Sequence, residues 1–330
     1  MKLAILSLTF IAGSIWGPMA WGQIAQSHPE FCGLADGFNP PLPDLSATVD
    51  GDGNAVLYLG QGNTGIPLRG NLPSPITQLS EVCPLSSGLL AVFGDFGGTE
   101  VFIVDPAKKT LVDLFNAYHP VISPNQRWIA FVKMYALHGV NGSNQYMLYD
   151  LTKQAAENRP DGDTRNDIDV GRVIFPPGHE NFPGSNVDLP KSQQHFGGTR
   201  IYWAPDSRAI AFEDRTAEGP GMVLVTLDDN GTPSAFRHEI TPAEMCGRDI
   251  PSGDSINWRL MRAELGPDGT RGAGGIVLDI DRSGGAGCVP HTLELQGADF
   301  NPAKTEANVR PTHTFGAIRD GRVVIPPKEK

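Results

Sequence analysis

Three segments of the chain share one order of small residue, Pro, polar turn and apolar strand. They cover residues 83–93, 123–132 and 204–212. Proline fixes φ at the first turn position, and the Asp, Asn or Ser beside it closes the turn through its side chain, so each segment predicts a hairpin. The strand after each turn, such as residues 128–132, is apolar on both faces. This pattern predicts a strand that is sandwiched between two other sheets.

Each unit continues with two further strands, the first of which ends at an Asp. Pro84 and Pro124 lie 40 residues apart, which is the length of one four-stranded propeller blade. The pattern therefore predicts an all-β fold: a single β-propeller of about five to six four-stranded blades over residues 45–330. We expect the terminal strand to complete the first blade and so close the ring. Beyond the repeated strands above, strands are expected near residues 45, 55–59, 100–105, 110–114, 145–150, 171–175, 222–228, 236–240, 258–265, 276–280, 315–318 and 322–325.

One repeat is about twice the usual length. Pro124 and Pro205 lie 81 residues apart, and the extra length includes residues 176–198, which are rich in Pro, Gly and Asn and carry no strand pattern. We interpret this run as a long loop inserted into one blade. A hidden additional blade is the alternative.

The first 22 residues have the features of a secretion signal. Lys2 precedes an almost continuous apolar run over residues 3–15, and Ala20 and Gly22 are small residues at the −3 and −1 positions of a cleavage site. We expect residues 1–22 to be a signal peptide and residues 23–44 an N-terminal extension of the propeller. The mature protein is then periplasmic or secreted, with no membrane span after cleavage. A retained N-terminal anchor is the alternative.

Composition and charge narrow the function classes. The 39 Gly and 28 Pro residues argue against long helices, and the net charge of −11 argues against nucleic acid or an anionic membrane surface as a partner.

The four cysteines predict two disulfides in an exported chain. Three pairings are open, and we favour Cys32–Cys83 with Cys246–Cys288 because each joins neighbours in sequence. Four unpaired buried thiols are the alternative.

The repeat resembles the PD40 repeat, a WD40-like repeat of TolB-type β-propellers of bacterial periplasms. It also resembles the propeller domains of prolyl-oligopeptidase-type peptidases. Asn125 replaces the usual Asp, and two units lack the Gly of Pro-Asp-Gly. The resemblance implies architectural roles for the motif residues and, as function, an exported non-catalytic protein-binding or scaffold module. The matching positions are Pro84, Pro124, Arg127, Ala130, Pro205, Asp206, Arg208 and Ala211.

Motifs for catalysis are missing from the sequence. It contains no Gly-x-Ser-x-Gly, and its eight histidines show no metal-ligand spacing. We predict no cofactor, with residues 161–169 as a minor calcium candidate because five of the nine are Asp or Asn. The alternative function is a propeller enzyme with an axial metal ion, of lactonase or hydrolase type. Whether the protein is an enzyme stays open, with a binding module favoured.

Alignment of the repeats selects the candidate binding residues. His119 and Arg200 each lie four residues before the small residue of a Pro turn, and Tyr118 and Thr199 precede them. We expect these four residues at the mouth of the propeller channel. The partner is expected to be another envelope or exported protein or a peptide.

Overall fold

A computed structural model describes the strands and several of their connections. Among the described residues, no helix has the length and apolar character needed to cross a bilayer. The description covers residues 32, 45–49, 55–59, 65–68, 78–95, 99–134, 144–165, 170–176, 201–216, 219–241, 243–244, 258–265, 276–282, 291–295, 299–303, 317–319 and 322–324.

Three consecutive antiparallel sheets form the best-described part of the chain. The strand order in each follows the sequence. The β4–β7 sheet consists of β4 (Gln78–Pro84), β5 (Leu90–Asp95), β6 (Thr99–Asp105) and β7 (Thr110–Asn116). The β8–β11 sheet consists of β8 (Tyr118–Ile122), β9 (Trp128–Met134), β10 (Asn144–Asp150) and β11 (Arg172–Phe175). The β12–β15 sheet consists of β12 (Ile201–Trp203), β13 (Ala209–Thr216), β14 (Gly219–Leu227) and β15 (Pro233–Glu239), with β19 (Asn301–Pro302) at its edge.

Smaller sheets precede and follow these three. A 3-10 helix, η1 (Ala155–Asn158), lies between β10 and β11. The remaining strands are β1 (Leu45–Val49), β2 (Ala55–Leu59) and β3 (Gly65–Leu68) in one sheet, β16 (Trp258–Leu265), β17 (Ile276–Arg282) and β18 (His291–Leu295) in a second, and the pair β20 (Ala317–Arg319) and β21 (Arg322–Val324).

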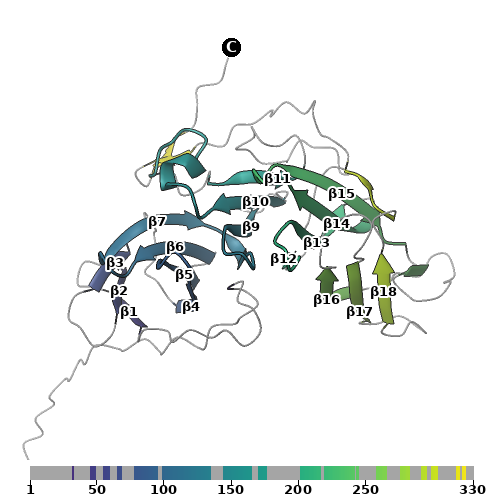
Figure 1. Ribbon diagram of the computed structural model, residues 1–330, viewed down its shortest axis with the longest axis horizontal. Helices are drawn as coiled ribbons and strands as arrows, with labels where there is room; N and C mark the ends of the chain where they lie inside the picture. The colour runs from purple at the N-terminus through teal and green to yellow at the C-terminus, as the bar shows by residue number, and fades with distance from the viewer. Residues whose placement is uncertain are drawn as a thin grey trace, which may run out of the picture.

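The consecutive sheets follow one another along an arc (Figure 1). The strands β4, β12 and β16 lie on the inner side of this arc, and β7 and β15 lie on its outer side. Trp203 of β12 donates its Nε1–H to the Val121 carbonyl of β8 over 3.2 Å, so two of the first strands are in direct contact. The molecule is therefore all-β, with several four-stranded antiparallel sheets arranged as propeller blades are.

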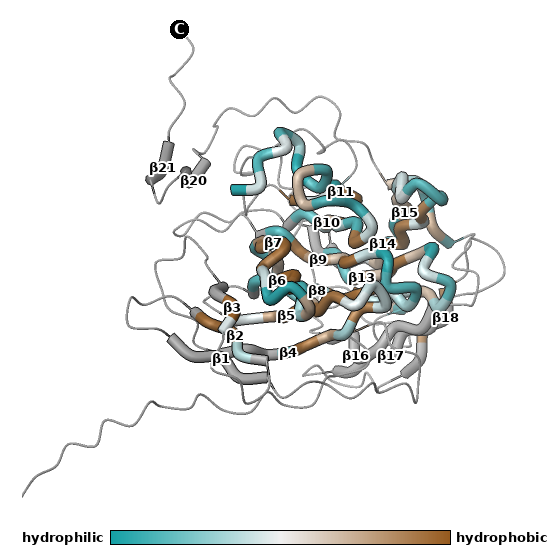
Figure 2. Tube along the Cα trace, turned by 60° about the vertical axis from the view of Figure 1, so that its left-hand side comes forward, coloured by the Kyte–Doolittle hydropathy of each residue, from teal (hydrophilic) through white to brown (hydrophobic). Residues whose placement is uncertain are grey.

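The central strands are buried on both faces, as their apolar pattern predicted. In β9, Ile129 and Phe131 belong to an apolar cluster shared with the β4–β7 sheet, whereas Ala130 and Val132 belong to one shared with the β12–β15 sheet. Because successive strand residues point to opposite faces, β9 contributes to two interfaces at once. Figure 2 shows hydrophobic stretches gathered in these strands and hydrophilic ones in their connections.

Aromatic rings fill the two interfaces. Phe115 of β7 stacks on Tyr149 of β10 with ring centroids 4.6 Å apart, which joins the first two sheets. Tyr146 of β10 stacks on Phe212 of β13 with centroids 3.5 Å apart, which joins the second and third. Stacked aromatic pairs contribute about 0.5–1.5 kcal/mol beyond the area they bury.

The second and third Pro turns close through the side chain that follows Pro, as predicted, whereas in the first turn the Leu85 N–H donates to the Leu89 carbonyl. The Gln126 N–H donates to the Ser123 carbonyl over 2.8 Å, and Asn125 Oδ1 accepts the Arg127 N–H over 3.0 Å. In the next unit the Arg208 N–H donates to Asp206 Oδ1 over 3.0 Å. The position at which the resembling repeat has Gly is left-handed, with φ of 55° at Gln126.

The two residues that replace this Gly, Gln126 and Ser207, link neighbouring sheets. The Gln126 amide donates to the Pro84 carbonyl over 3.2 Å, and its Oε1 accepts the Ser86 N–H over 2.7 Å. Ser207, with φ of 63°, is buried, and its Oγ accepts the Asn125 N–H over 2.9 Å. The three turns are thus hydrogen-bonded into one row.

The ends of the chain differ from the expected closure. In the part of the chain that the structure describes, β20 and β21 pair with each other and not with the β1–β3 sheet. The edge of the β12–β15 sheet is instead extended by β19, with Phe236 opposite Pro302. The predicted loop insertion lies almost wholly outside the described residues. The signal peptide lies outside them entirely.

Candidate functional site

The predicted site residues Tyr118 and His119 lie at the start of β8. His119 is exposed and has a left-handed backbone with φ of 48°. The pairing of β8 with β9 shifts in register between Tyr118 and Val121, so His119 and Pro120 lie in a bulge. Tyr118 is half-buried and packs against the apolar cluster of the second interface. The other two predicted residues, Thr199 and Arg200, lie outside the described residues.

His119 lies at what we call the loop end of the sheets, where β5 joins β6, β9 joins β10 and β13 joins β14. The strand register places Tyr118 opposite Val132, close to the end of β9. We call the opposite end, which carries the three Pro turns, the turn end. The loop end also holds several polar side chains that are almost completely buried: Glu81, Glu100, Lys133, Gln145, Glu213 and Asp214.

An ionic cluster lies at this end between the β8–β11 and β12–β15 sheets. The Asp214 side chain is fully buried and accepts Arg237 Nε–H at Oδ2 over 3.2 Å. Arg237 also donates to Glu239 Oε1 over 3.3 Å, and the Glu239 side chain is 72% exposed. A Cβ at Gly221 would lie 2.8 Å from the Arg237 guanidinium carbon, so only glycine leaves space for this group. The cluster therefore runs from the interior to the surface.

Tyr146 closes the buried side of this cluster. Its hydroxyl donates to the Glu213 carbonyl over 3.1 Å. Burial, together with the charges of Asp214 and Glu213, raises the pKa of Tyr146 well above its usual value. The hydroxyl therefore stays protonated and remains a hydrogen-bond donor. This arrangement holds a sheet interface and presents Arg237 and Glu239 at its rim.

A second buried network joins the β4–β7 and β8–β11 sheets. Arg159 binds both carboxylate oxygens of Asp113, over 2.6 and 2.9 Å, and also donates to the Ala155 and Leu114 carbonyls. The Tyr149 hydroxyl donates to Asp113 Oδ2 over 2.7 Å. Burial and the Asp113 charge raise the pKa of Tyr149, so this hydroxyl also stays protonated. The network therefore consists of matched donors and acceptors that tie two sheets together.

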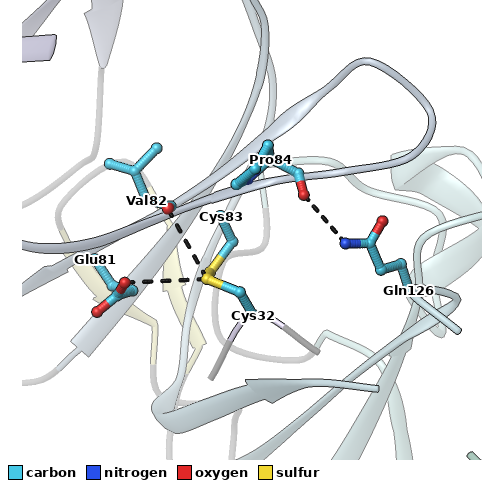
Figure 3. The surroundings of a disulfide bond; sticks show 6 residues. All are labelled: Cys32, Glu81, Val82, Cys83, Pro84 and Gln126. Carbon is cyan, nitrogen blue, oxygen red and sulfur yellow. Dashed lines mark hydrogen bonds between the residues drawn. A yellow bond between two sulfur atoms is a disulfide. The ribbon is translucent and has the colours of Figure 1, made fainter. Parts of the chain in front are cut away.

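One group of metal-ligand type occurs within the described residues, and it contains a disulfide (Figure 3). Cys32, Glu81 and Cys83 have ligand atoms within 4.8 Å of one another. Cys32 and Cys83 are bonded to each other, as predicted, and this bond ties residue 32 to β4. Cys32 Sγ lies 4.0 Å from Glu81 Oε1, and a disulfide sulfur has no hydrogen to donate. With both sulfurs in the disulfide, the group offers no thiolate ligand. Cys246 and Cys288 lie outside the described residues.

The predicted calcium loop is described only over its first half. Asp163 accepts hydrogen bonds from the main chain and the guanidinium of Arg165, with the two side chains 2.8 Å apart. Asp161 accepts the Asp163 N–H over 3.0 Å. The oxygens of Asp163 are therefore bound to a cation of the protein itself. The rest of the loop, residues 166–169, lies outside the described residues.

The motif arginines, Arg127 and Arg208, lie at the turn end, where they contact the β14–β15 turn. Arg127 lies over the Trp128 ring with its guanidinium carbon 4.2 Å from the centroid and donates to the Asp229 carbonyl over 2.9 Å. Arg208 pairs with the Asp229 carboxylate over 2.9 Å. A Cβ at Gly231 would lie 2.6 Å from the Trp128 ring. These contacts are consistent with an architectural role for the motif arginines.

The sequence contained no signal for the two buried ionic networks. Asp113 and Arg159 are 46 residues apart, and Asp214 and Arg237 are 23 apart on different strands. Asp113 is buried in β7 and needs a partner, because an isolated buried carboxylate is costly, but residues 110–116 show no alternation of apolar and polar residues that would have marked this position as inward.

Comparisons with known proteins show distant similarity to propeller-containing structures. No family model matches the chain, and no curated protein matches it. TolB from Acinetobacter baumannii is 14% identical with a TM-score of 0.31, and the match covers 74% of this chain and 48% of that one, so this chain spans about half the length of TolB. Kuenenia stuttgartiensis hydrazine synthase is 11% identical with a TM-score of 0.32, covering 87% and 70% of the two chains. A post-proline cleaving enzyme from Rickettsia typhi is 12% identical with a TM-score of 0.28, covering 70% and 37%. At these TM-scores, no property of those proteins carries over to this chain.

Proposed function

We propose that this chain is an exported, non-catalytic binding or scaffold module built on a β-propeller of about five to six blades. We expect its partner to be another exported or envelope protein, or a peptide, and the partner to bind at the loop end of this chain. The observation that carries the proposal is the position of His119, an exposed side chain on a left-handed residue in a strand bulge. Bulges next to functional sites re-aim a side chain, and a left-handed non-glycine residue persists only where its surroundings hold it there.

The frame behind His119 suits a binding role. The sheets are joined by stacked aromatic rings, by two buried ionic networks and by the hydrogen-bonded row of turns. A site whose supporting strands are fixed in this way loses little conformational entropy when a partner binds. Arg200 is the second proposed anchor, because the repeat alignment gives it the position of His119 and a guanidinium can bind a partner carboxylate through two hydrogen bonds.

The test is capture of exported proteins by the purified mature protein. We expect the double variant His119→Ala, Arg200→Ala to weaken capture by on the order of 1–3 kcal/mol in binding free energy, with its melting temperature unchanged. The matched control is Arg208→Ala, which removes an exposed arginine at the turn end and should leave capture unchanged. Unchanged capture by the double variant would remove both residues from the site. A lowered melting temperature would show that they are packed positions of the frame.

A further inference from the structure

His238 of β15 bridges two segments that pack against the edge of its sheet. Its Nδ1 lies 3.0 Å from the Asp299 carbonyl oxygen, and its Nε2 lies 3.0 Å from Glu244 Oε1. The imidazole is 15% exposed, and its ring centroid lies 6.0 Å from that of the buried Phe300. One side chain therefore holds the turn after β15 and the segment that leads into β19.

Both ring nitrogens face hydrogen-bond acceptors. A carbonyl oxygen only accepts, so Nδ1 must carry a hydrogen. Glu244 is an acceptor as well: its other oxygen, Oε2, accepts the Thr241 N–H over 2.7 Å and the Thr241 hydroxyl over 2.8 Å. Partial burial of Glu244 opposes ionisation, but the Thr241 hydrogen bonds and the nearby His238 outweigh it and lower the pKa of Glu244. An ionised Glu244 requires a hydrogen on Nε2 too, so the two bonds together require the imidazolium form of His238.

Among the charged side chains that the structure describes near His238, the Glu244 carboxylate is the one that contacts its ring. On β14 the residue opposite is Met222, which carries no charge. On β15 itself, Arg237 and Glu239 pair with each other. The segment before β19 presents the Asp299 carbonyl to the ring, and the exposed Asp299 carboxylate is the further charge on that segment. Leu293 and Leu295 of β18 belong to the apolar cluster on this face of the sheet, together with Met222 and Phe300.

We propose that His238 is a pH-sensitive latch: its protonated ring pins residues 241–244 and the segment 299–303 onto the β12–β15 sheet, and its deprotonation releases one of them. A neutral imidazole has a single N–H and keeps only one of the two bonds. The latch is closed while both ring nitrogens carry a hydrogen and opens when the ring loses one of them. The strand β19 is the part to loosen, because its main-chain attachment to β15 is short: a two-residue pairing and one hydrogen bond from the Ala303 N–H to the Ala235 carbonyl, beside the buried ring of Phe300.

Amide hydrogen exchange of the full-length mature protein tests this latch. At pH 8.0 we expect residues 299–303 to open about tenfold more often than at pH 5.5, after correction for the intrinsic exchange rate, because one charged hydrogen bond contributes at least that factor. His238→Gln should remove the pH response, and Glu244→Gln should reduce it. The matched control is His119→Gln, which removes an imidazole from another sheet and should keep the full response.

Either of two hydrogen-exchange results would overturn the latch. One is equal protection of residues 299–303 at both pH values in the folded wild-type protein, and the other is a full pH response in His238→Gln. If that variant fails to fold, nitrogen NMR of the wild-type ring decides: we expect two protonated ring nitrogens at pH 5.5 and one at pH 8.0. A ring with one protonated nitrogen at pH 5.5 contradicts the proposal.

Discussion

The buried pair of Arg159 and Asp113 should be essential to the stability of the interface between the β4–β7 and β8–β11 sheets. The two side chains are 0% and 2% exposed. Replacing Arg159 with Met keeps much of the apolar stem but leaves the Asp113 carboxylate buried without its cation. Breaking a buried pair in this way costs about 3–5 kcal/mol, far more than a surface pair contributes.

Further variants show how much each contact of Asp113 contributes to the free energy of unfolding. Tyr149→Phe keeps the ring stacked on Phe115 and removes one hydrogen bond to a charged acceptor, which should cost about 1.5–3 kcal/mol. The double variant Arg159→Met, Asp113→Leu removes both charges. Its loss of stability should therefore be clearly smaller than the summed losses of the single variants Arg159→Met and Asp113→Leu, because no buried charge is left alone.

Urea unfolding at pH 7, followed by fluorescence and by circular dichroism, measures these free energies. Coincident transitions by the two probes are needed to treat unfolding as two-state. A loss below 1 kcal/mol for Arg159→Met, or losses that simply add in the double variant, would show that the two residues are not a buried pair.

Four other predictions concern the turns, the connections and the cysteines. Gln126→Gly should be more stable than Gln126→Ala by about 1 kcal/mol in urea unfolding, because φ at this position is 55° and both variants lose the same side-chain bonds; an equal or more stable Ala variant contradicts the left-handed turn. Gly231→Ala should destabilise the protein by on the order of 1–3 kcal/mol, since φ is 73° and the new Cβ would lie 2.6 Å from the Trp128 ring; an unchanged melting temperature would rule out that contact. The intact mass of the unreduced mature protein should be about four hydrogens below that of the reduced form, as two disulfides require; four alkylatable thiols would contradict this. Limited proteolysis should cut first within residues 176–198, and a first cut inside β9 would contradict this expectation.

The strands and turns were determined by local sequence. Residues 128–132 are apolar at every position, and the structure buries them on both faces. The Pro turns could also be predicted from the local sequence, because Pro124 and Asn125 fix the conformation of their immediate neighbours. The predicted Cys32–Cys83 bond, which joins the first two cysteines of the sequence, is also present.

The candidate site was only partly accessible to sequence reasoning. Repeat alignment placed His119 at the start of β8, but the bulge and the left-handed φ depend on how β8 pairs with β9. The contacts of His238 could not be predicted, because its two acceptors lie 6 and 61 residues away and reach it only when the chain folds back onto its sheet. The short strand β19 was missed since two residues carry no periodicity.

The sequence by itself therefore determined the local features: the strands, the turns, and the face of the sheet on which each side chain lies. What only the tertiary structure decided is which charged groups meet. The carboxylate of Asp113 could be buried only because Arg159, which follows the next three strands, reaches it with both donors. Alternation along a strand has a period of two residues and is visible in the local sequence. The partner of a buried charge is instead set by how whole sheets pack, which the local sequence does not specify.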